Sequence, residues 1–366
     1  MKLAFLLFEY FPYGGLQRDM LAIAEAAEAR GHQVTVFTRA WHAERPAMPR
    51  VETVAVAARS NHGRDAAFVA AVRGRLAGFD RVVGFNKMPG LDWYYAADGC
   101  LAARYRGPRR WLPRYRSKLA MEAAVFDPAA ATGVLSISPL QRALYQRHYG
   151  TPDARFVDLP PGIRHDRALP EDYALRRARL RTELGIGETT PILLFVGSGF
   201  RTKGLDRAIR ALARLPEETR LFVVGDDNAG PYRRLARRLN VDSRVRFMGG
   251  QDNVPEWLWS ADLLIHPAYA ENTGTVLLEA AVAGLPVLTT RACGYAGYIR
   301  DGGLGRVLGD PDGEELAAAA TDLLARPRDY WREQGRRFAA DADIYGLVER
   351  AVDAIEQDAT EQKEPR

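Results

Sequence analysis

Short apolar runs alternate with segments of helical period along most of the chain. A short apolar run bounded by turn residues is typical of a strand buried on both faces, and its alternation with helices indicates βαβ units and parallel sheets. The first half of the chain contains the runs LAFLLF, QVTVFT, VETVAV, RVVGF and VLSIS, and the second half contains PILLFVG, RLFVVG, RVRFMG, DLLIHP and PVLTT. We therefore predict an α/β fold with two doubly wound parallel sheets.

The two sheets are predicted to belong to consecutive domains. Two prolines and a glycine at 160–162 interrupt the alternation, so we assign residues 1–165 to an N-terminal Rossmann-like domain and residues 166–342 to a C-terminal one. Residues 343–366 are predicted to form a C-terminal helix, crossing back to the N-terminal domain, and a frayed tail. Doubly wound sheets bind ligands at the carboxyl ends of their strands, so we expect the site in a cleft between the domains.

Composition restricts the partners and the compartment. The formal net charge of +5 favours an anionic partner, without choosing among nucleic acid, a phosphorylated substrate and a membrane surface. Cys100 and Cys293 have neither pairing nor metal-ligand spacing, which favours a reducing compartment. The apolar run Leu3–Phe8 is too short for a signal peptide, and no segment has the length of a membrane span, so we expect a cytoplasmic protein.

Glycine-rich turns are predicted to follow the first strand of each domain. In the N-terminal domain, Gly14 and Gly15 precede a helix, where a close backbone approach and free N–H groups suit an anion; an ordinary tight turn is the alternative. In the C-terminal domain, the turn GSGFRTKG carries Thr202 where a dinucleotide fingerprint needs its third glycine, and it lacks a Walker triplet. Its cations, Arg201 and Lys203, can neutralise a diphosphate, although a solvated basic loop is the alternative.

Two carboxylates frame a third junction, AYAENTGTVLLEA. Glu271 precedes a polar corner, and Glu279 lies eight residues later, two turns into an apolar helix that begins near Gly274. The free N–H groups of that helix can bind a diphosphate, and carboxylates bind vicinal hydroxyls by accepting two hydrogen bonds. The layout suits a nucleoside diphosphate sugar, with Glu279 at the ribose and Glu271 at the transferred sugar. Helix capping and solubility are the alternative.

These motifs resemble the retaining glycosyltransferases of family 4, which have the GT-B fold. Further segments, in order from residue 1 to about 300, are similar to the lipopolysaccharide-core glucosyltransferases of that family: YFPYGGLQRDM, NHGR, RVVGFNKMPGLDWYYAAD, LPPGI, TKGLDR, ADLLIHPAY and ACGYAGYI. The resemblance implies an acceptor-binding N-terminal domain and a C-terminal domain that binds the nucleotide sugar. The implied reaction moves a hexose from a UDP-sugar, with UDP-glucose favoured, to the second heptose of the inner core of lipopolysaccharide, with retention of configuration.

The resemblance also implies roles for individual residues. The implied donor-binding residues are Gly14, Gly15, Arg167, Arg201, Thr202, Lys203, Asn272, Thr273, Gly274, Thr275, Val276 and Glu279. The candidate catalytic residues are Glu271, Lys203, Asp98 and Asp19. Three positions depart from the family pattern: Thr202 replaces a second cation before Lys203, Gln251 replaces a basic residue of some relatives, and Asp98 stands where many members have a histidine. Asp19 can equally compensate the helix dipole, and Asp98 can equally be a structural cap.

We expect no metal ion and no other cofactor. Metal-dependent transferases hold a divalent ion with a D-x-D motif, but Asp341 and Asp343, which have this spacing, lie near the C-terminus with no glycine-rich corner beside them. Lys203, Arg201 and the helix start at Gly274 can stabilise the leaving UDP instead. Retention by double displacement needs a carboxylate on the far face of the sugar, and the sequence identifies none. A same-face attack, with the leaving phosphate taking the acceptor proton, is what the resemblance implies.

Other functions stay open at this point. The same reaction with UDP-N-acetylgalactosamine or another UDP-hexosamine is one, because Asn272 and Thr273 could shape the pocket around an acetamido group. A nucleotide-dependent oxidoreductase or epimerase is disfavoured by Thr202. A non-catalytic protein that binds lipopolysaccharide or nucleic acid is the third alternative.

A basic segment, RYRGPRRWLPRYRSK at residues 104–118, suggests a membrane partner. It contains seven cations with interleaved aromatic residues and no acid, and its prolines predict a loop or a pair of short helices. Such a segment suits the anionic cytoplasmic face of the inner membrane, where a heptosylated lipid A acceptor would lie. We therefore expect peripheral, salt-sensitive binding through Arg109, Arg110 and Arg114. A solvated basic face is the alternative, and no nucleic-acid-binding module surrounds the segment.

Overall fold

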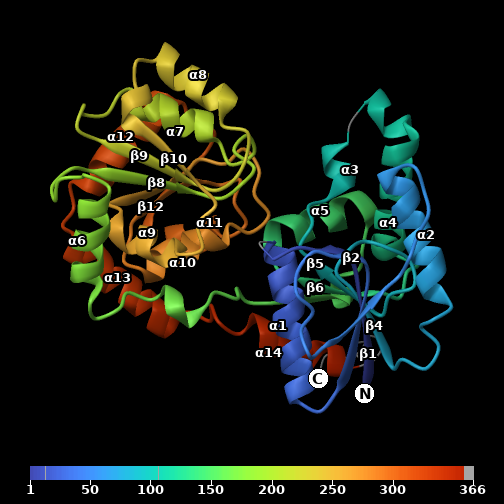
Figure 1. The fold of residues 1–366 in the computed structure, drawn as a ribbon. Helices are drawn as coiled ribbons and strands as arrows, with labels where there is room; N and C mark the ends of the chain where they lie inside the picture. Colours follow the sequence, from blue (N-terminus) through green and yellow to red (C-terminus); the bar gives the residue numbers. More distant parts are fainter. Residues whose placement is uncertain (13, 106, 358–366) are drawn as a thin grey trace. The chain divides into compact units, whose positions relative to one another are not determined.

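A computed structural model describes residues 1–12, 14–105 and 107–357 (Figure 1). The chain divides into two compact units. Unit 1 comprises Met1–Gly162 together with the segment from Tyr345 that carries the last helix, and unit 2 comprises Ile163–Ile344. The first domain was predicted to end at 165 and the C-terminal segment to begin at 343, which differ from these limits by three residues and by two residues. The predicted frayed tail falls largely on 358–366, outside the described residues.

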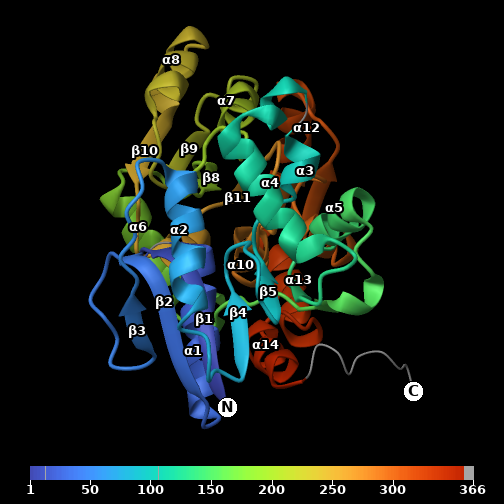
Figure 2. The same cartoon turned by 90° about the vertical axis from the view of Figure 1, so that its right-hand side faces the viewer.

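Unit 1 contains a seven-stranded sheet in the order β3-β2-β1-β4-β5-β6-β7, in which every pair of neighbours is parallel. Figure 2 shows the first five of these strands side by side. The strand order reverses between β1 and β4, which is the switch point where such folds bind ligands. The strands are β1 Lys2–Tyr10, β2 Gln33–Trp41, β3 Arg50–Thr53, β4 Arg81–Gly84, β5 Trp93–Ala96, β6 Gly133–Ser136 and β7 Phe156–Asp158.

Unit 2 contains a six-stranded parallel sheet in the order β10-β9-β8-β11-β12-β13, with its own switch point between β8 and β11. The strands are β8 Ile192–Val196, β9 Arg220–Val224, β10 Val245–Gly249, β11 Leu263–His266, β12 Val287–Thr290 and β13 Gly305–Leu308. The predicted α/β class with two doubly wound sheets is therefore confirmed.

Helices cover both sheets. In unit 1 they are α1 Gly15–Ala29, α2 Asn61–Arg73, α3 Leu101–Arg104, α4 Pro113–Phe126, α5 Pro139–Tyr149 and α14 Leu347–Glu356. In unit 2 they are α6 Tyr173–Glu183, α7 Leu205–Leu212, α8 Gly230–Arg238, α9 Val254–Ser260, α10 Thr275–Val282, α11 Ala296–Asp301, α12 Gly313–Leu324 and α13 Arg328–Asp341. Short 3₁₀ turns lie at Pro108–Trp111, Asp153–Arg155, His165–Arg167 and Asp242–Arg244.

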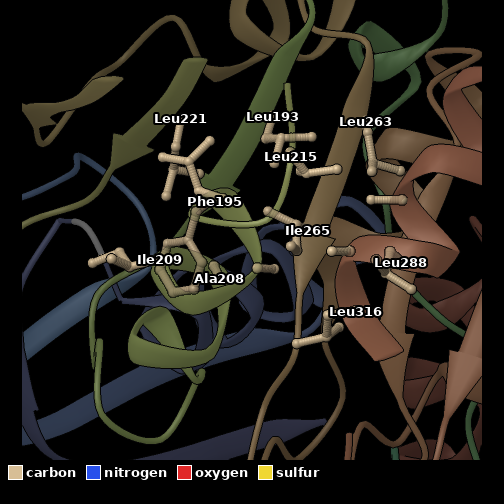
Figure 3. Packing of buried hydrophobic residues seen from close by; sticks show 14 of the residues in the cluster. Leu193, Phe195, Ala208, Ile209, Leu215, Leu221, Leu263, Ile265, Leu288 and Leu316 are labelled. Carbon is tan, nitrogen blue, oxygen red and sulfur yellow. The ribbon is translucent and has the colours of Figure 1, made fainter. Parts of the chain in front are cut away.

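Alternate strand residues build the core of unit 2 (Figure 3). Leu193 and Phe195 of β8, Ile265 of β11, and Ile209 of α7 all belong to one cluster and are fully buried. Successive strand residues face opposite sides of a sheet, so a run such as ILLFV fills the core on both faces, and this is why these runs lack a polar alternation.

The last helix belongs structurally to unit 1. α14 packs against α1, where Leu347, Ala351 and Ile355 join the same core as the first strand. Arg30, at the end of α1, pairs with acidic residues of α14, including Asp353 at 2.6 Å.

The basic segment does not form two short helices. A 3₁₀ turn at Pro108–Trp111 is followed by the 14-residue α4, which begins with Pro113 at its first position, where the missing N–H costs nothing. Arg106 lies outside the described residues. Within the described part of the chain, no helix has both the length and the apolar character needed to cross a membrane.

Candidate active site

Lys203 is placed by the turn between β8 and α7. Gly197, with φ of 121°, has no side chain to block the lysine, and a Cβ there would lie 2.8 Å from Lys203 Cε. Gly204, with φ of 76°, brings the start of α7 against the end of β11, since a Cβ would lie 2.1 Å from the carbonyl oxygen of Pro267. The glycines of this turn therefore position a cation instead of completing a dinucleotide fingerprint.

Lys203 Nζ forms a hydrogen-bonded ion pair with Glu271. The two residues are 68 positions apart in the sequence, and both side chains are mostly buried. His266, the fully buried last residue of β11, places its Nε2 3.6 Å from the same carboxylate. A lysine, a glutamate and a histidine therefore meet at the carboxyl ends of β8 and β11.

The charges in this cluster are strongly coupled. Burial raises the pKa of Glu271, but His266 and the positive charge of Lys203 outweigh it and bring the pKa down to about 2. Burial lowers the pKa of His266, so the imidazole is neutral at pH 7 and can offer one N–H to the carboxylate. Glu271 is thus held as an anion that can accept hydrogen bonds but is a poor proton donor near neutral pH.

The loop after β11 is fixed by its backbone. Glu271 donates its N–H to the carbonyl of Ala292 at 3.2 Å, and the carbonyl of Thr273 accepts from the N–H of Tyr295 at 2.8 Å. Gly274, with φ of 81°, then leads into α10, and no side chain at this position caps the helix. The first turn of α10, with Thr275 and Val276, thus presents its amides at the same sheet edge as Lys203, which suits an anion.

Glu279 lies one turn further along α10 and is engaged by a second cation. Its Oε1 accepts a hydrogen bond from Arg167 Nε at 3.1 Å, and Glu279 is only 8% exposed. Arg167 comes from the 3₁₀ turn at the start of unit 2, and its carbonyl accepts a long 3.4 Å bond from the indole of Trp259. The structure thus joins Arg167 and Glu279, which the sequence placed separately around the donor.

Arg201 and Thr202 lie on the same turn, but their side chains have different surroundings. Arg201 is exposed on the turn. The hydroxyl of Thr202 donates to the carbonyl of Gly199 at 3.0 Å, and its own carbonyl accepts from the N–H groups of Tyr269 and Ala270. Thr202 therefore ties the lysine turn to the loop that carries Glu271, which is a structural reason for a residue without charge at that position. Asn272, the residue after Glu271, is partly buried.

The N-terminal candidates gather at the carboxyl end of the sheet of unit 1. Gly14 precedes α1, where a Cβ would collide with the Gln17 side chain, whereas a Cβ on Gly15 would meet no atom within 4 Å. Asp19 accepts a hydrogen bond from the hydroxyl of Tyr95 at 2.8 Å. Burial raises the pKa of Asp19, although Arg18 and the Tyr95 hydroxyl oppose this.

Asp98 follows β5, the strand that carries Tyr95. Its side chain is exposed, and its carbonyl accepts from the hydroxyl of Tyr145 at 2.5 Å. Beneath this loop, the buried Lys87 Nζ bonds the Glu122 carboxylate at 2.6 Å and the carbonyl of Gly99 at 2.7 Å. Glu122 also accepts the first backbone N–H groups of α3 at 2.8 Å, so a buried ion pair fixes the position of the Asp98 loop.

No group of three or more potential metal-ligating side chains occurs within residues 1–12, 14–105 and 107–357. Asp341 closes α13. A second pair with D-x-D spacing, Asp310 and Asp312, has other partners. Asp310 pairs with Arg207, and the carboxylate of Asp312 caps α12 by accepting from the N–H groups of Glu314 and Glu315.

The sequence interpretation missed two residues that support the site. His266 was contained in the run DLLIHP, and its position as the last residue of a buried strand was the available signal. Tyr95, which holds Asp19, had no local signal because its partner lies 76 residues away.

Two doubly wound domains, with a lysine–glutamate pair and an uncapped helix start at the carboxyl edge of the second sheet, define a glycosyltransferase of the GT-B class. Comparison with known proteins agrees. The model of "Glycosyltransferase Family 4" matches residues 13–167, and that of "Glycosyl transferases group 1" matches residues 176–338. The chain is 45% identical over 370 residues to the "Lipopolysaccharide glucosyltransferase WaaG" of Escherichia coli strain K12, covering 97% of this chain and 98% of that protein.

Solved structures give the same result. The crystal structure of WaaG, "a glycosyltransferase involved in lipopolysaccharide biosynthesis", matches with a TM-score of 0.90 over 97% of this chain and 99% of that one, at 45% identity. Anabaena Alr3699/HepE in complex with UDP and glucose matches with a TM-score of 0.78 over 97% and 99% of the two chains, but at 19% identity it shares the fold alone. This chain belongs to the family 4 glycosyltransferases and is a glycosyltransferase.

Proposed function

We propose that this enzyme transfers a hexose from a UDP-sugar, with UDP-glucose favoured, to the second heptose of the lipopolysaccharide inner core. The observation that carries the proposal is the 45% identity along almost the full length of both chains to a protein named as a lipopolysaccharide glucosyltransferase. The intact Lys203–Glu271 pair at the start of α10 supports it, because this is the part of the fold in which a donor has to bind.

The proposed donor-binding residues contact three different parts of the UDP-sugar: the diphosphate, the transferred sugar and the ribose. The amides at the start of α10 and the ammonium of Lys203 bind the diphosphate, since both carry positive charge at one sheet edge. Glu271, held as an anion, accepts hydrogen bonds from hydroxyls of the sugar. Glu279 accepts from the ribose, with Arg167 fixing its carboxylate.

The reaction follows from these charges. As the bond from the anomeric carbon to the phosphate oxygen breaks, negative charge develops on UDP, and Lys203, with Arg201 nearby in sequence, stabilises it. The acceptor hydroxyl forms the new bond on the same face, and its proton passes to the leaving phosphate oxygen, so the configuration is retained. The residues supply the positive charge that a divalent metal supplies elsewhere, so we propose a metal-independent enzyme.

The acceptor is proposed to be a heptosylated lipid A core at the cytoplasmic face of the inner membrane. In unit 1, the segment 104–118 exposes Trp111 and Leu112, with fractional exposures of 70% and 48%, beside its cations. Aromatic and aliphatic side chains next to lysine and arginine favour the interface of an anionic bilayer. This segment would bring the enzyme to its lipid-linked substrate.

A UDP-hexosamine is the alternative donor. Asn272 and Thr273, polar residues beside Glu271, are the observation that favours it, because polar sites discriminate hydroxyl from acetamido groups. A side-by-side measurement of kcat/KM for UDP-glucose and UDP-N-acetylgalactosamine decides between the two donors.

The proposal is tested by incubating the enzyme with UDP-glucose and heptosylated lipid A, and measuring UDP release together with the mass of the acceptor. The expected result is one added hexose per acceptor at an unchanged rate in EDTA. UDP release without a change in acceptor mass would exclude this acceptor. A strict need for added magnesium would exclude the metal-independent reaction.

A further inference from the structure

Unit 2 contains a cavity at the opposite edge of its sheet from the donor site. The cavity has a volume of about 800 Å³ and is lined by parts of α6, the turn before β8, the residue before β11, and the junction of α12 and α13. Pro191 immediately precedes β8, and Asp262 immediately precedes β11. Because Lys203 and Glu271 lie beyond the carboxyl ends of these strands, the cavity at the amino ends is a separate site.

Five arginines line this cavity, namely Arg177, Arg181, Arg326, Arg328 and Arg332, against the two acids Asp262 and Glu188. Asp262 is shared by three of the arginines, with ion pairs to Arg177 at 3.1 Å, to Arg181 at 3.4 Å and to Arg328. One carboxylate therefore faces three guanidinium groups in a mostly buried cluster. Such a cluster has a positive charge that its own acid does not neutralise.

The other two arginines that line the cavity, Arg326 and Arg332, add to this excess of positive charge. Arg332 bonds the hydroxyl of Tyr173 at 2.6 Å and pairs with the exposed Asp329 at 2.8 Å. Arg326 is exposed, and among the described residues it stacks on Tyr330 and Trp331 without forming an ion pair with a carboxylate. Burial, and then the charge of Arg332, lower the pKa of Arg328 to about 10.

The cavity also has an apolar wall. Ile186, Leu323 and Trp331 line it beside the arginines, and its volume is in the range of pockets that hold small organic ligands. Guanidinium groups approaching from several elements suit a phosphate, which accepts bidentate bonds and carries more charge than a single carboxylate. The wall suits the organic part of the same ligand.

We propose that this arginine-lined cavity binds a phosphate-bearing organic anion, at a site that is distinct from the donor site and can be occupied together with it. Arg326, Arg328 and Arg332 contact the phosphate, and Ile186 and Trp331 contact the organic group. The site goes beyond the transfer reaction and does not depend on which sugar is moved.

The test is a calorimetric titration of the enzyme with inorganic pyrophosphate at low ionic strength, in the presence of saturating UDP to fill the donor site. We expect a binding event that persists with UDP, that is weakened about tenfold or more by Arg326→Gln, and that is unchanged by Arg237→Gln, which removes an equally exposed charge on α8. Arg328→Gln is the second variant, and thermal melting verifies that each variant is folded.

Two outcomes would overturn the proposal. One is the absence of pyrophosphate binding in the UDP-saturated wild type, and the other is equal binding by wild type and Arg326→Gln. Phosphatidylglycerol vesicles, tested in parallel, separate a lipid headgroup from a soluble anion. If pyrophosphate binding depends on Arg326, the result supports a soluble ligand. If only vesicle binding depends on Arg326, the result contradicts the proposal of a soluble ligand.

Discussion

At the scale of single residues, the site depends on one carboxylate shared between a lysine and a histidine. Glu271 neutralises Lys203 in the free enzyme, so a diphosphate has to compete with it for the ammonium. We predict that Glu271→Gln leaves UDP binding unchanged or tighter but lowers kcat about a hundredfold, because it loses the charged acceptor for the sugar hydroxyls. Calorimetry with UDP and turnover assays measure the two effects. A parallel loss of UDP affinity would mean that Glu271 serves only to position Lys203.

The same carboxylate predicts a dependence of stability on pH. The folded-state pKa of Glu271, about 2, lies below its ordinary value of 4.5, so its contribution is present above pH 4.5 and is lost as the pH falls toward 2. The shift corresponds to about 3 kcal/mol. Part of this contribution remains at pH 3, so we expect the difference in unfolding free energy between wild type and Glu271→Gln to decrease by about 2 kcal/mol between pH 6 and pH 3. A difference that does not change with pH would contradict the coupling.

At the scale of elements, helix α10, whose first turn is proposed to bind the diphosphate, packs against α13. Gly335 of α13 allows this contact, since a Cβ there would lie 2.1 Å from the carbonyl oxygen of Ala281. We predict that Gly335→Ala lowers the unfolding free energy by about 1–3 kcal/mol, because the two helices have to separate. Gly297→Ala is the matched control: it is also helical but has no atom closer than 3.9 Å, so it should be neutral or stabilising. The unfolding free energies of wild type and of both variants are measured by denaturant unfolding.

The strands that were predicted are mostly those that read as long apolar runs. The runs that became β1, β8 and β11 are apolar throughout because both faces of these strands are covered. Three strands, β5, β7 and β13, were missed. β7 and β13 are short and carry polar residues, FVD and GRVL, whereas β5, WYYA, is buried throughout but only four residues long. The turn residues around Lys203 and the acids around α10 were also found from the sequence, because each lies within one loop. Their pairing was not, because the contact between Lys203 and Glu271 joins two separate βα units.

At the scale of the whole molecule, the sequence predicted two α/β domains and a returning helix, since these follow from the alternation of elements. It also predicts attachment to a membrane through residues 104–118. Neutralising Arg109, Arg110 and Arg114 should weaken binding to vesicles rich in anionic lipid, by about one kcal/mol for each charge near the surface, and high salt should weaken wild-type binding. The side chains of Arg109 and Arg110 lie outside what the structure describes, so vesicle cosedimentation is the direct measurement. Equal binding to zwitterionic and anionic vesicles would assign the segment another role.

The central claim is that Lys203, at the carboxyl edge of the second sheet, stabilises the UDP leaving group during transfer to a heptosylated acceptor. The most direct measurement is the initial rate of UDP release from UDP-glucose with that acceptor, compared among wild type, Lys203→Ala and Arg237→Ala, an exposed charge removed elsewhere in unit 2. We predict a loss of about a hundredfold or more for Lys203→Ala and an unchanged rate for Arg237→Ala, with all three proteins folded. Near-normal turnover in folded Lys203→Ala would contradict the claim.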